Sequence, residues 1–212
     1  MAKRKNNQKK TVLAIFVEGD TEVEFYKKMI SSIQSKADRA NCIIQLKNVK
    51  GIGNYQTKVC RMFDKSIKRK YPNDKYNYVV ALCYDTDVFD FDKKPPVNWD
   101  SVIKELKTKG ANSVELIRAE KSIEDWFLYD SEGLKRFLRL PIKINISSYK
   151  GQQGLTQLFR KANKSYIKGI QCKGLVDALD MDKIFPHICK EIHVLCNTIG
   201  VNCSDFNERC KL

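Results

Sequence analysis

Hydrophobic residues in this 212-residue chain occur in two patterns, as short unbroken runs and as stretches with helical spacing. Unbroken runs cover residues 12–17 (VLAIFV) and 78–84 (YVVALCY), and similar segments occur at 42–49 and 114–117. Apolar runs of this length, bounded by polar turns, are typical of strands buried on both faces of a sheet. The sequence therefore predicts a four-stranded sheet in the first two thirds of the chain.

The intervals between these runs carry apolar residues at every third or fourth position, the spacing of one face of a helix. This spacing predicts helices at 20–33, 59–70, 99–109 and from Ser122 onward. Strands joined by helical crossovers run parallel, with helices on both faces of the sheet. The expected fold is therefore α/β, with a mainly parallel, Rossmann-like sheet.

The chain divides into three expected parts. Residues 1–10 (MAKRKNNQKK) are basic and predict a flexible tail. Residues 11–140 contain the alternating strands and helices and form the α/β core. Residues 141–212 contain helical patterns without a strong strand, and they predict a helical C-terminal extension packed on the same core.

The composition indicates a folded, basic protein. Hydrophobic residues make up 42% of the chain, enough for a substantial core. Lysine and arginine number 39 against 25 aspartate and glutamate, a formal net charge of +14. This excess indicates a polyanionic partner such as nucleic acid. No apolar run approaches the roughly 18 residues of a membrane helix, so a cytoplasmic location away from membranes is expected.

The eight cysteines contain no CxxC pair. Four of them follow one another at intervals of seven residues from Cys189 to Cys210, whereas ligand pairs in zinc sites usually lie two to four residues apart. Cys42, Cys60 and Cys83 lie in apolar stretches. The cysteines are therefore expected to be reduced thiols in the core, or incidental ones, rather than metal ligands.

Two groups of acidic residues follow predicted strands. Glu18, Asp20 and Glu22 come after the first strand, and Asp85 and Asp87 come after the third. Asp20 is expected to cap the following helix. Because parallel strands end at the same edge of a sheet, the other carboxylates should converge and repel one another. A divalent cation such as Mg²⁺ relieves this repulsion, so the pattern predicts a metal site.

The order of these motifs resembles a known family. VEGDTE at 17–22 followed by YDTD at 84–87 is similar to the Toprim pattern, which is shared by topoisomerases, bacterial-type primases and the OLD and RloB-like nucleases. SIEDWFL at 122–128 resembles a further segment of the OLD and RloB-like group, with a shorter spacing between serine and glutamate. The resemblance covers roughly residues 11–130 and extends weakly into 149–151 and 166–169.

The resemblance implies that residues 11–140 are a Toprim-like catalytic core that hydrolyses phosphodiester bonds with Mg²⁺ or Mn²⁺. It implies a nuclease of bacterial anti-phage defence, acting on RNA such as tRNA or on DNA. Glu18, Asp85 and Asp87 would be the catalytic residues. The implied metal ligands are Glu18, Glu22, Asp85, Asp87 and Glu124.

Several partners follow from the same resemblance. OLD nucleases carry an ATPase in the same chain, but no Walker motif occurs in this one. A separate ATPase or sensor protein, and a second copy of the chain, are therefore candidate partners beside nucleic acid. Basic residues beside turns and strand ends are expected to contact the substrate phosphates. These are Lys50, Arg118, Lys121 and Lys150.

Two other interpretations remain open at the level of sequence. The segment around Asp85 and Asp87 also fits a haloacid-dehalogenase-like phosphatase, in which Asp85 is the nucleophile and Asp87 the acid or base. That class places the motif on its first strand, and it leaves Glu18 and Glu22 unexplained. The second alternative is a non-catalytic Toprim-like module that binds nucleic acid or a nucleotide as a sensor or partner subunit.

Overall fold

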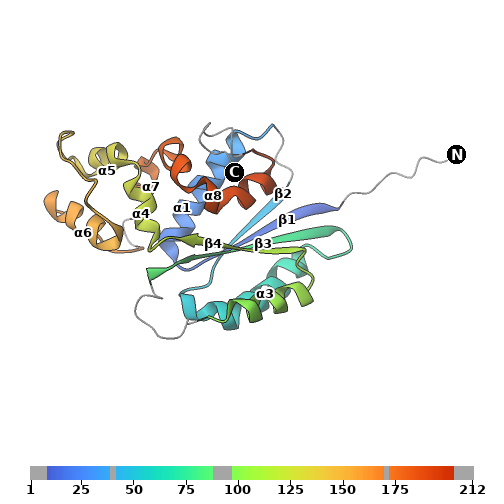
Figure 1. Cartoon of the computed structure of the whole chain (residues 1–212). Helices are drawn as coiled ribbons and strands as arrows, with labels where there is room; N and C mark the ends of the chain where they lie inside the picture. The colour runs from blue at the N-terminus through green and yellow to red at the C-terminus, as the bar shows by residue number, and fades with distance from the viewer. Residues whose placement is uncertain (1–8, 39–41, 88–96, 170–171, 203–212) are drawn as a thin grey trace.

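A computed structural model describes residues 9–38, 42–87, 97–169 and 172–202. Within these residues, four strands form one parallel sheet in the order β2-β1-β3-β4 (Figure 1). The predicted α/β class with a parallel four-stranded sheet is therefore confirmed. The strands are β1 (Lys10–Val17), β2 (Cys42–Asn48), β3 (Tyr76–Asp85) and β4 (Ser113–Ala119).

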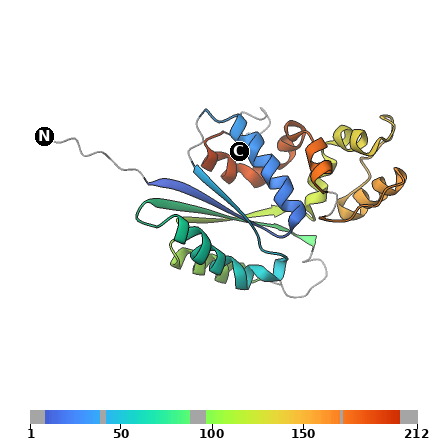
Figure 2. The ribbon, with the colours of Figure 1, turned by 180° about the vertical axis from the view of Figure 1, so that it is seen from behind.

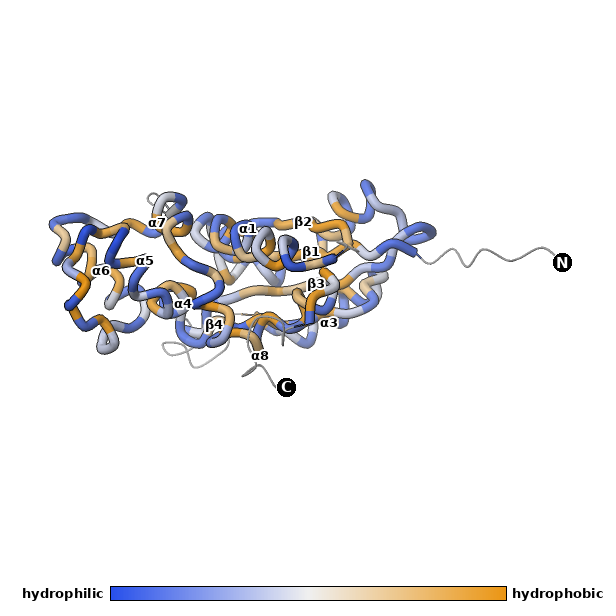
Figure 3. Tube along the Cα trace, turned by 90° about the horizontal axis from the view of Figure 1, so that it is seen from above, coloured by the Kyte–Doolittle hydropathy of each residue, from blue (hydrophilic) through white to orange (hydrophobic). Residues whose placement is uncertain are grey.

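The central strands are the most apolar part of the chain. The side chains of β1 from Val12 to Val17 are completely buried, because β2 and β3 flank this strand and helices cover both of its faces. Figure 3 shows the same feature as hydrophobic colour along the strands. Continuous burial is the reason that the sequence of β1 is an unbroken apolar run rather than an alternating one.

Helices cover both faces of the sheet (Figures 1 and 2). Side chains of β1 alternate between these faces. Leu13 and Ile15 pack with α1 (Asp20–Ser35) and α8 (Met181–Ile199) in one apolar cluster. Val12, Ala14 and Phe16 pack in a second cluster with the helical segment 55–70 and α3 (Trp99–Thr108).

The helical segment 55–70 is wound loosely. Two π-helical stretches, Tyr55–Val59 and Phe63–Lys68, flank the short α2 (Cys60–Met62). The Tyr55 hydroxyl lies within hydrogen-bonding distance of two carbonyl oxygens, Phe16 O on β1 and Cys83 O on β3. This side chain therefore braces the carboxyl ends of the two central strands, beside the predicted metal site.

Further helices extend beyond the carboxyl edge of the sheet, at the left of Figure 1. They share the apolar cluster of α1, and α8 then returns across β1 and β4. This arrangement places the helices that follow β4 next to the strand ends. They are α4 (Ile123–Leu128), α5 (Ser131–Leu138), α6 (Gly151–Lys161) and α7 (Cys172–Ala178).

Two local predictions are wrong. Asp20 does not cap α1, because the N-cap residue is Gly19, and the Asp20 carboxylate instead accepts a hydrogen bond from Asn48 Nδ2 at 2.7 Å. The basic tail is shorter than expected, since Lys10 already pairs with Tyr76 as the first residue of β1. Residues 1–8 of the tail lie outside the described residues.

Among the described cysteines, Cys60 and Cys83 are buried as expected, whereas Cys42 is only partly buried. Cys189 and Cys196 are buried within α8. Cys203 and Cys210 lie outside the described residues. Within the described part of the chain, no helix is both long enough and apolar enough to span a bilayer.

Candidate metal centre

Carboxylates from four elements meet at the carboxyl edge of the sheet. Glu18 follows β1, Asp85 is the last residue of β3, and Glu22 and Glu124 lie in the first turns of α1 and α4. The backbone N–H of Asp85 donates to Glu18 Oε1 at 2.8 Å, and that of Ile123 donates to Asp85 Oδ1 at 2.9 Å. Adjacent parallel strands and two helix starts therefore bring together residues that are distant in the sequence.

The ammonium group of Lys168 lies among these carboxylates. Its Nζ atom is 3.2 Å from Glu22 Oε1, 3.2 Å from Asp85 Oδ2 and 3.8 Å from Glu124 Oε1. The three carboxylate side chains are almost fully buried, whereas 37% of the Lys168 side chain is exposed. A cation thus approaches the carboxylates from the solvent side.

Two contacts hold the loop that carries Lys168. The Tyr166 hydroxyl donates to Glu124 Oε1 at 2.9 Å, and the N–H of Gly169 donates to Thr21 Oγ1 at 2.9 Å. Gly169 has a φ of +90°, a left-handed conformation that glycine adopts without strain. The loop between α6 and α7 is therefore attached to the first turns of both α1 and α4.

The environment favours the protonated form of two carboxyl groups. Burial raises the pKa of Glu18 to about 7, although the hydrogen bond from the Asp85 backbone opposes this effect. Burial also raises the pKa of Asp85 to about 8; the charge of Lys168 lowers it, and Glu22 and Glu124 raise it further. For Lys168, burial disfavours the charge, but the carboxylates, Asp85 foremost, raise its pKa overall. The cluster carries more negative charge than Lys168 neutralises.

Several oxygens at this site lack hydrogen-bond donors among the described residues. Glu22 Oε2 and Glu124 Oε2 are buried without a hydrogen-bond partner, and Glu22 Oε1 has only its ion pair with Lys168 at 3.2 Å. A Cβ atom at Gly19 would come within 2.9 Å of Glu22 Oε2, so glycine is needed there for this carboxylate to keep its place. Buried oxygens without partners are rare in proteins and suit a hard cation that takes oxygen ligands.

In the described part of the chain, no three acidic, thiol or imidazole groups are already arranged as a set of metal ligands. The reason is geometric. Oxygens that surround an ammonium at 3.2 to 3.8 Å must move inward to reach the distance of about 2 Å that Mg²⁺ requires. The donor set therefore fits a divalent cation in its chemistry, and in this structure the Lys168 ammonium contacts the three carboxylates in its place.

Asp87 and Lys121 are joined just beyond the strand ends. The N–H of Asp87 donates to Lys121 O at 2.9 Å, and the N–H of Lys121 donates to Thr86 Oγ1 at 2.7 Å. The negative charge of Asp87 contributes to the raised pKa of Glu18, so Asp87 lies on the same edge of the sheet. Lys121 has a φ of +63°, a strained conformation for a residue with a Cβ.

The predicted phosphate-binding lysines lie around this edge. Lys50 is exposed with a φ of +63°, and the following N–H, that of Gly51, donates to Glu18 O at 2.8 Å. Lys150 is exposed beside Gly151, whose N–H donates to Asp125 Oδ1 at 2.7 Å.

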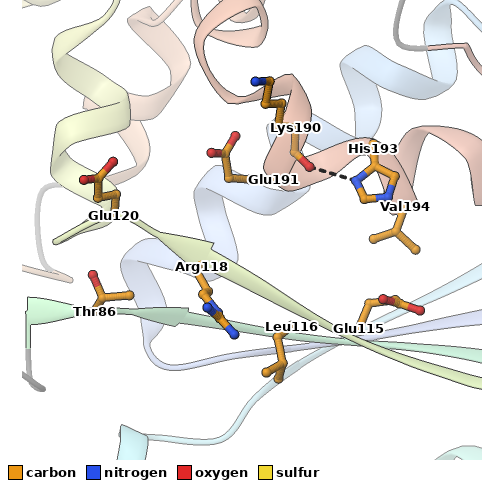
Figure 4. A pocket seen from close by; sticks show the side chains of 9 residues that line it. All are labelled: Thr86, Glu115, Leu116, Arg118, Glu120, Lys190, Glu191, His193 and Val194. Atoms are coloured by element: carbon orange, nitrogen blue, oxygen red, sulfur yellow. Dashed lines mark hydrogen bonds between the residues drawn. The ribbon is translucent and has the colours of Figure 1, made fainter. Parts of the chain in front are cut away.

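Arg118 has a different location from these lysines. It lines a hollow of about 300 Å³ along β4 and α8, with Glu120 and Glu191 on the wall (Figure 4). Arg118 lies beside Tyr84: burial raises the pKa of that phenol, and the charge of Arg118 opposes the effect. Along β4 it alternates with Ile117 and Ala119, so it points to the opposite face of the sheet from those residues.

Lys168 and Tyr166 were not among the predicted site residues. The signal in the sequence was the short segment YIKG at 166–169, which resembles the family pattern only weakly. Lysine and tyrosine in a loop give no indication of their partners. Lys168 is 83 positions from Asp85 and 146 positions from Glu22 in the sequence. These contacts depend on the way the helices after β4 fold back.

Comparisons of the chain with protein-family models, with curated proteins and with solved structures gave no match. The functional argument therefore depends on the geometry of the site and on the motifs described above.

Proposed function

We propose that this protein is a Toprim-type nuclease that hydrolyses phosphodiester bonds of nucleic acid with a divalent cation. The observation that carries the proposal is the convergence of Glu22, Asp85 and Glu124 around one ammonium group at the carboxyl edge of a parallel sheet. Open α/β sheets bind their ligands at this edge. The resemblance of VEGDTE, YDTD and SIEDWFL to Toprim motifs supports the same activity.

The residues that would hold Mg²⁺ or Mn²⁺ are the carboxylates of this cluster. A bound divalent ion would polarise a phosphoryl oxygen and lower the pKa of an attacking water. Glu124 and Glu22 are placed at helix N-termini, where the helix dipole stabilises their negative charge. The ligand set comprises Glu18, Glu22, Asp85, Asp87 and Glu124.

The side chains around the metal have distinct tasks. The pKa of Glu18, about 7, is suited to a group that accepts and returns a proton near neutral pH. Lys168 lies among the carboxylates that would hold the cation, and its partly exposed ammonium would be placed to face a substrate phosphate. Lys50, Lys121 and Lys150 surround the same edge and would attract the nucleic-acid backbone.

One observation favours a second candidate, a non-catalytic module that binds nucleic acid or a nucleotide. Lys168 already contacts three carboxylates, which is the task that a metal ion would have. In that case the lysine is a permanent structural counter-ion. The site then binds no divalent cation, and substitution of its carboxylates leaves any cellular effect of the protein unchanged.

The two candidates are separated by incubating the purified protein with tRNA, single-stranded DNA and duplex DNA in Mg²⁺, Mn²⁺ or EDTA. Wild type should cleave at least one substrate in the presence of metal, and Asp85→Ala should cleave none. Glu22→Gln should reduce cleavage by at least roughly 10-fold, as expected for a metal ligand. Glu24→Gln is the matched control, because Glu24 lies on the same helix and pairs with Lys27 at 2.7 Å.

A metal-dependent cut by wild type that disappears in Asp85→Ala supports the nuclease, and its substrate decides between RNA and DNA. Identical behaviour of wild type and Asp85→Ala on all three substrates overturns it. A role in anti-phage defence belongs to the same proposal, and phage plating on cells that express wild type or Asp85→Ala tests that role.

A further inference from the structure

A cavity of about 610 Å³ lies beside the carboxylate cluster, on the other side of α4. Its volume is within the range of roughly 300 to 1,000 Å³ that is common for small-molecule sites. Three parts of the chain form its walls: the end of β4 with α4 and α5, the loop 145–150, and the first half of α8. None of the proposed metal ligands lies in these walls, and the chemistry of the walls is of three kinds.

The first kind is aromatic. Tyr129 stacks on His187 with ring centroids 4.3 Å apart and planes 9° apart, and 42% of Tyr129 is exposed. Trp126 is buried in the same wall, and Tyr149 of the loop is covered by the ammonium of Lys161 at 5.3 Å from the ring centroid. An exposed, flat ring pair offers a stacking surface for another planar group.

The second kind is basic. Lys121, Lys135 and Lys150 line the cavity. Lys121 is connected to the metal centre, because its backbone carbonyl accepts from the N–H of Asp87 at 2.9 Å. Lys150 precedes Gly151, whose N–H is bonded to Asp125, the residue after Glu124. Two of the three lysines thus lie at the end of the cavity that adjoins the carboxylate cluster.

The third kind is acidic. Glu120, Asp125 and Glu191 also line the cavity. They lie close to the phenol of Tyr129, whose pKa is raised by burial first and then by these three charges. Asp125 Oδ2 and Glu191 Oε2 have no hydrogen-bond donor among the described residues. Such a wall repels a phosphate but can accept N–H groups, which nucleobases carry on their edges.

We propose that this cavity receives an unpaired nucleobase next to the scissile phosphate, so that the substrate is single-stranded at the site of cleavage. The base stacks on the ring pair of Tyr129 and His187, and the backbone phosphate lies at Lys121 and Lys150. A partly open cavity of this volume has room for one base that has left its stack, but not for a duplex. The inference depends on the proposed function for the nature of its ligand.

The test measures binding without cleavage. The full chain is titrated in EDTA with a short fluorescein-labelled single strand, in RNA and DNA versions, and with a duplex of the same composition. Wild type should bind the single strand more tightly than the duplex in fluorescence anisotropy. Tyr129→Ala should weaken binding of the single strand by roughly 10-fold, the effect of losing one base–aromatic stack.

Tyr71→Ala is the matched control for loss of a partly exposed tyrosine ring. Tyr71 lies edge-on to Tyr76, with ring centroids 5.3 Å apart, and packs on the α3 side of the sheet. This variant should bind the strand as wild type does. A second measurement needs no substitution: a strand that carries a photoreactive pyrimidine should cross-link to wild type at peptides containing Tyr129 or Tyr149, as identified by mass spectrometry.

Equal affinity for strand and duplex overturns the inference, and so does a Tyr129→Ala variant that binds like wild type. Cross-links confined to peptides outside α4 and the loop 145–150 also overturn it. These outcomes are independent of hydrolysis. If the protein binds the strand in this way but cleaves nothing with metal, the proposed function is wrong and the base site stands. If it cleaves with metal but does not bind the strand in this way, the base site is wrong and the proposed function stands.

Discussion

Asp85 and Asp130 are both nearly or completely buried, with exposures of 4% and 0%, but their surroundings differ in kind. Asp130 is the N-cap of α5: its Oδ1 accepts the N–H of Gly133 at 3.0 Å, and its Oδ2 accepts the N–H of Asp180 at 2.7 Å. Fixed backbone donors therefore satisfy both oxygens. This aspartate ties the start of α5 to the start of α8.

Asp85 shares its surroundings with other acids. One oxygen accepts a backbone N–H, and the other contacts the ammonium of Lys168, which Glu22 and Glu124 also contact. An acid held by fixed N–H groups stabilises the fold, whereas acids that compete for one exposed cation keep some of their repulsion. The contrast supports a structural role for Asp130 and the proposal that an added cation binds the cluster of Asp85.

The first expected difference between the two aspartates concerns stability. Asp130→Ala leaves two buried N–H groups without an acceptor and should lower the free energy of unfolding by about 3 kcal/mol. Asp85→Ala loses the backbone hydrogen bond from Ile123 and the contact with Lys168, but it also removes a carboxyl group that is buried among other acids, so its loss should be less than half as large. Urea unfolding in EDTA at neutral pH measures both. Equal losses, or a larger loss for Asp85→Ala, would contradict the comparison.

The lysines beside the two aspartates give the next difference. Lys168→Gln should reduce metal-dependent cleavage on the order of 100-fold, because a positive charge facing the transferring phosphate is lost. Lys183→Gln is the matched control, since Lys183 lies 3.9 Å from Asp130 and is well exposed. Initial cleavage rates with saturating Mg²⁺ compare the two variants. Similar rates for Lys168→Gln and Lys183→Gln would remove Lys168 from the mechanism.

A third expected effect is a dependence of stability on pH. The folded protein holds protons on Glu18 and Asp85 up to pH values of about 7 and about 8, whereas the unfolded chain releases them near 4. The folded state therefore binds more protons across this window, and metal-free stability should fall as the pH rises through it. The expected slope is about 1.4 kcal/mol per pH unit for each carboxyl group.

Urea unfolding in EDTA at several pH values between 5 and about 8 tests this slope. A variant that combines Glu18→Gln with Asp85→Asn should show a flatter profile, because neither replacement titrates. In saturating Mg²⁺ the wild-type profile should flatten or reverse, since metal ligands must be deprotonated. A wild-type profile in EDTA that matches that of the double variant would show that the two groups do not carry these protons.

Much of the fold and part of the site could be predicted from the sequence. Unbroken apolar runs indicated strands buried on both faces, and the helical spacing between them indicated parallel crossovers; both features depend on residues close in the chain. The placement of Glu18 and Asp85 after neighbouring strands predicted that they would meet, because parallel strands share an edge. The cap of α1 was predicted wrongly, because Asp20 and Gly19 are both acceptable N-caps and the contact of Asp20 with Asn48 decides between them.

The sequence by itself thus determined the α/β class, the parallel sheet and the pair of acidic strand ends. The tertiary structure alone decided which cation faces them. Lys168 reaches Glu22, Asp85 and Glu124 because α6 and α7 fold back over the sheet edge and Gly169 is tied to Thr21. Periodicity records which side of an element is buried, but it carries no information about which distant loop will face it. Burial and contact between distant residues set the charge balance of this site.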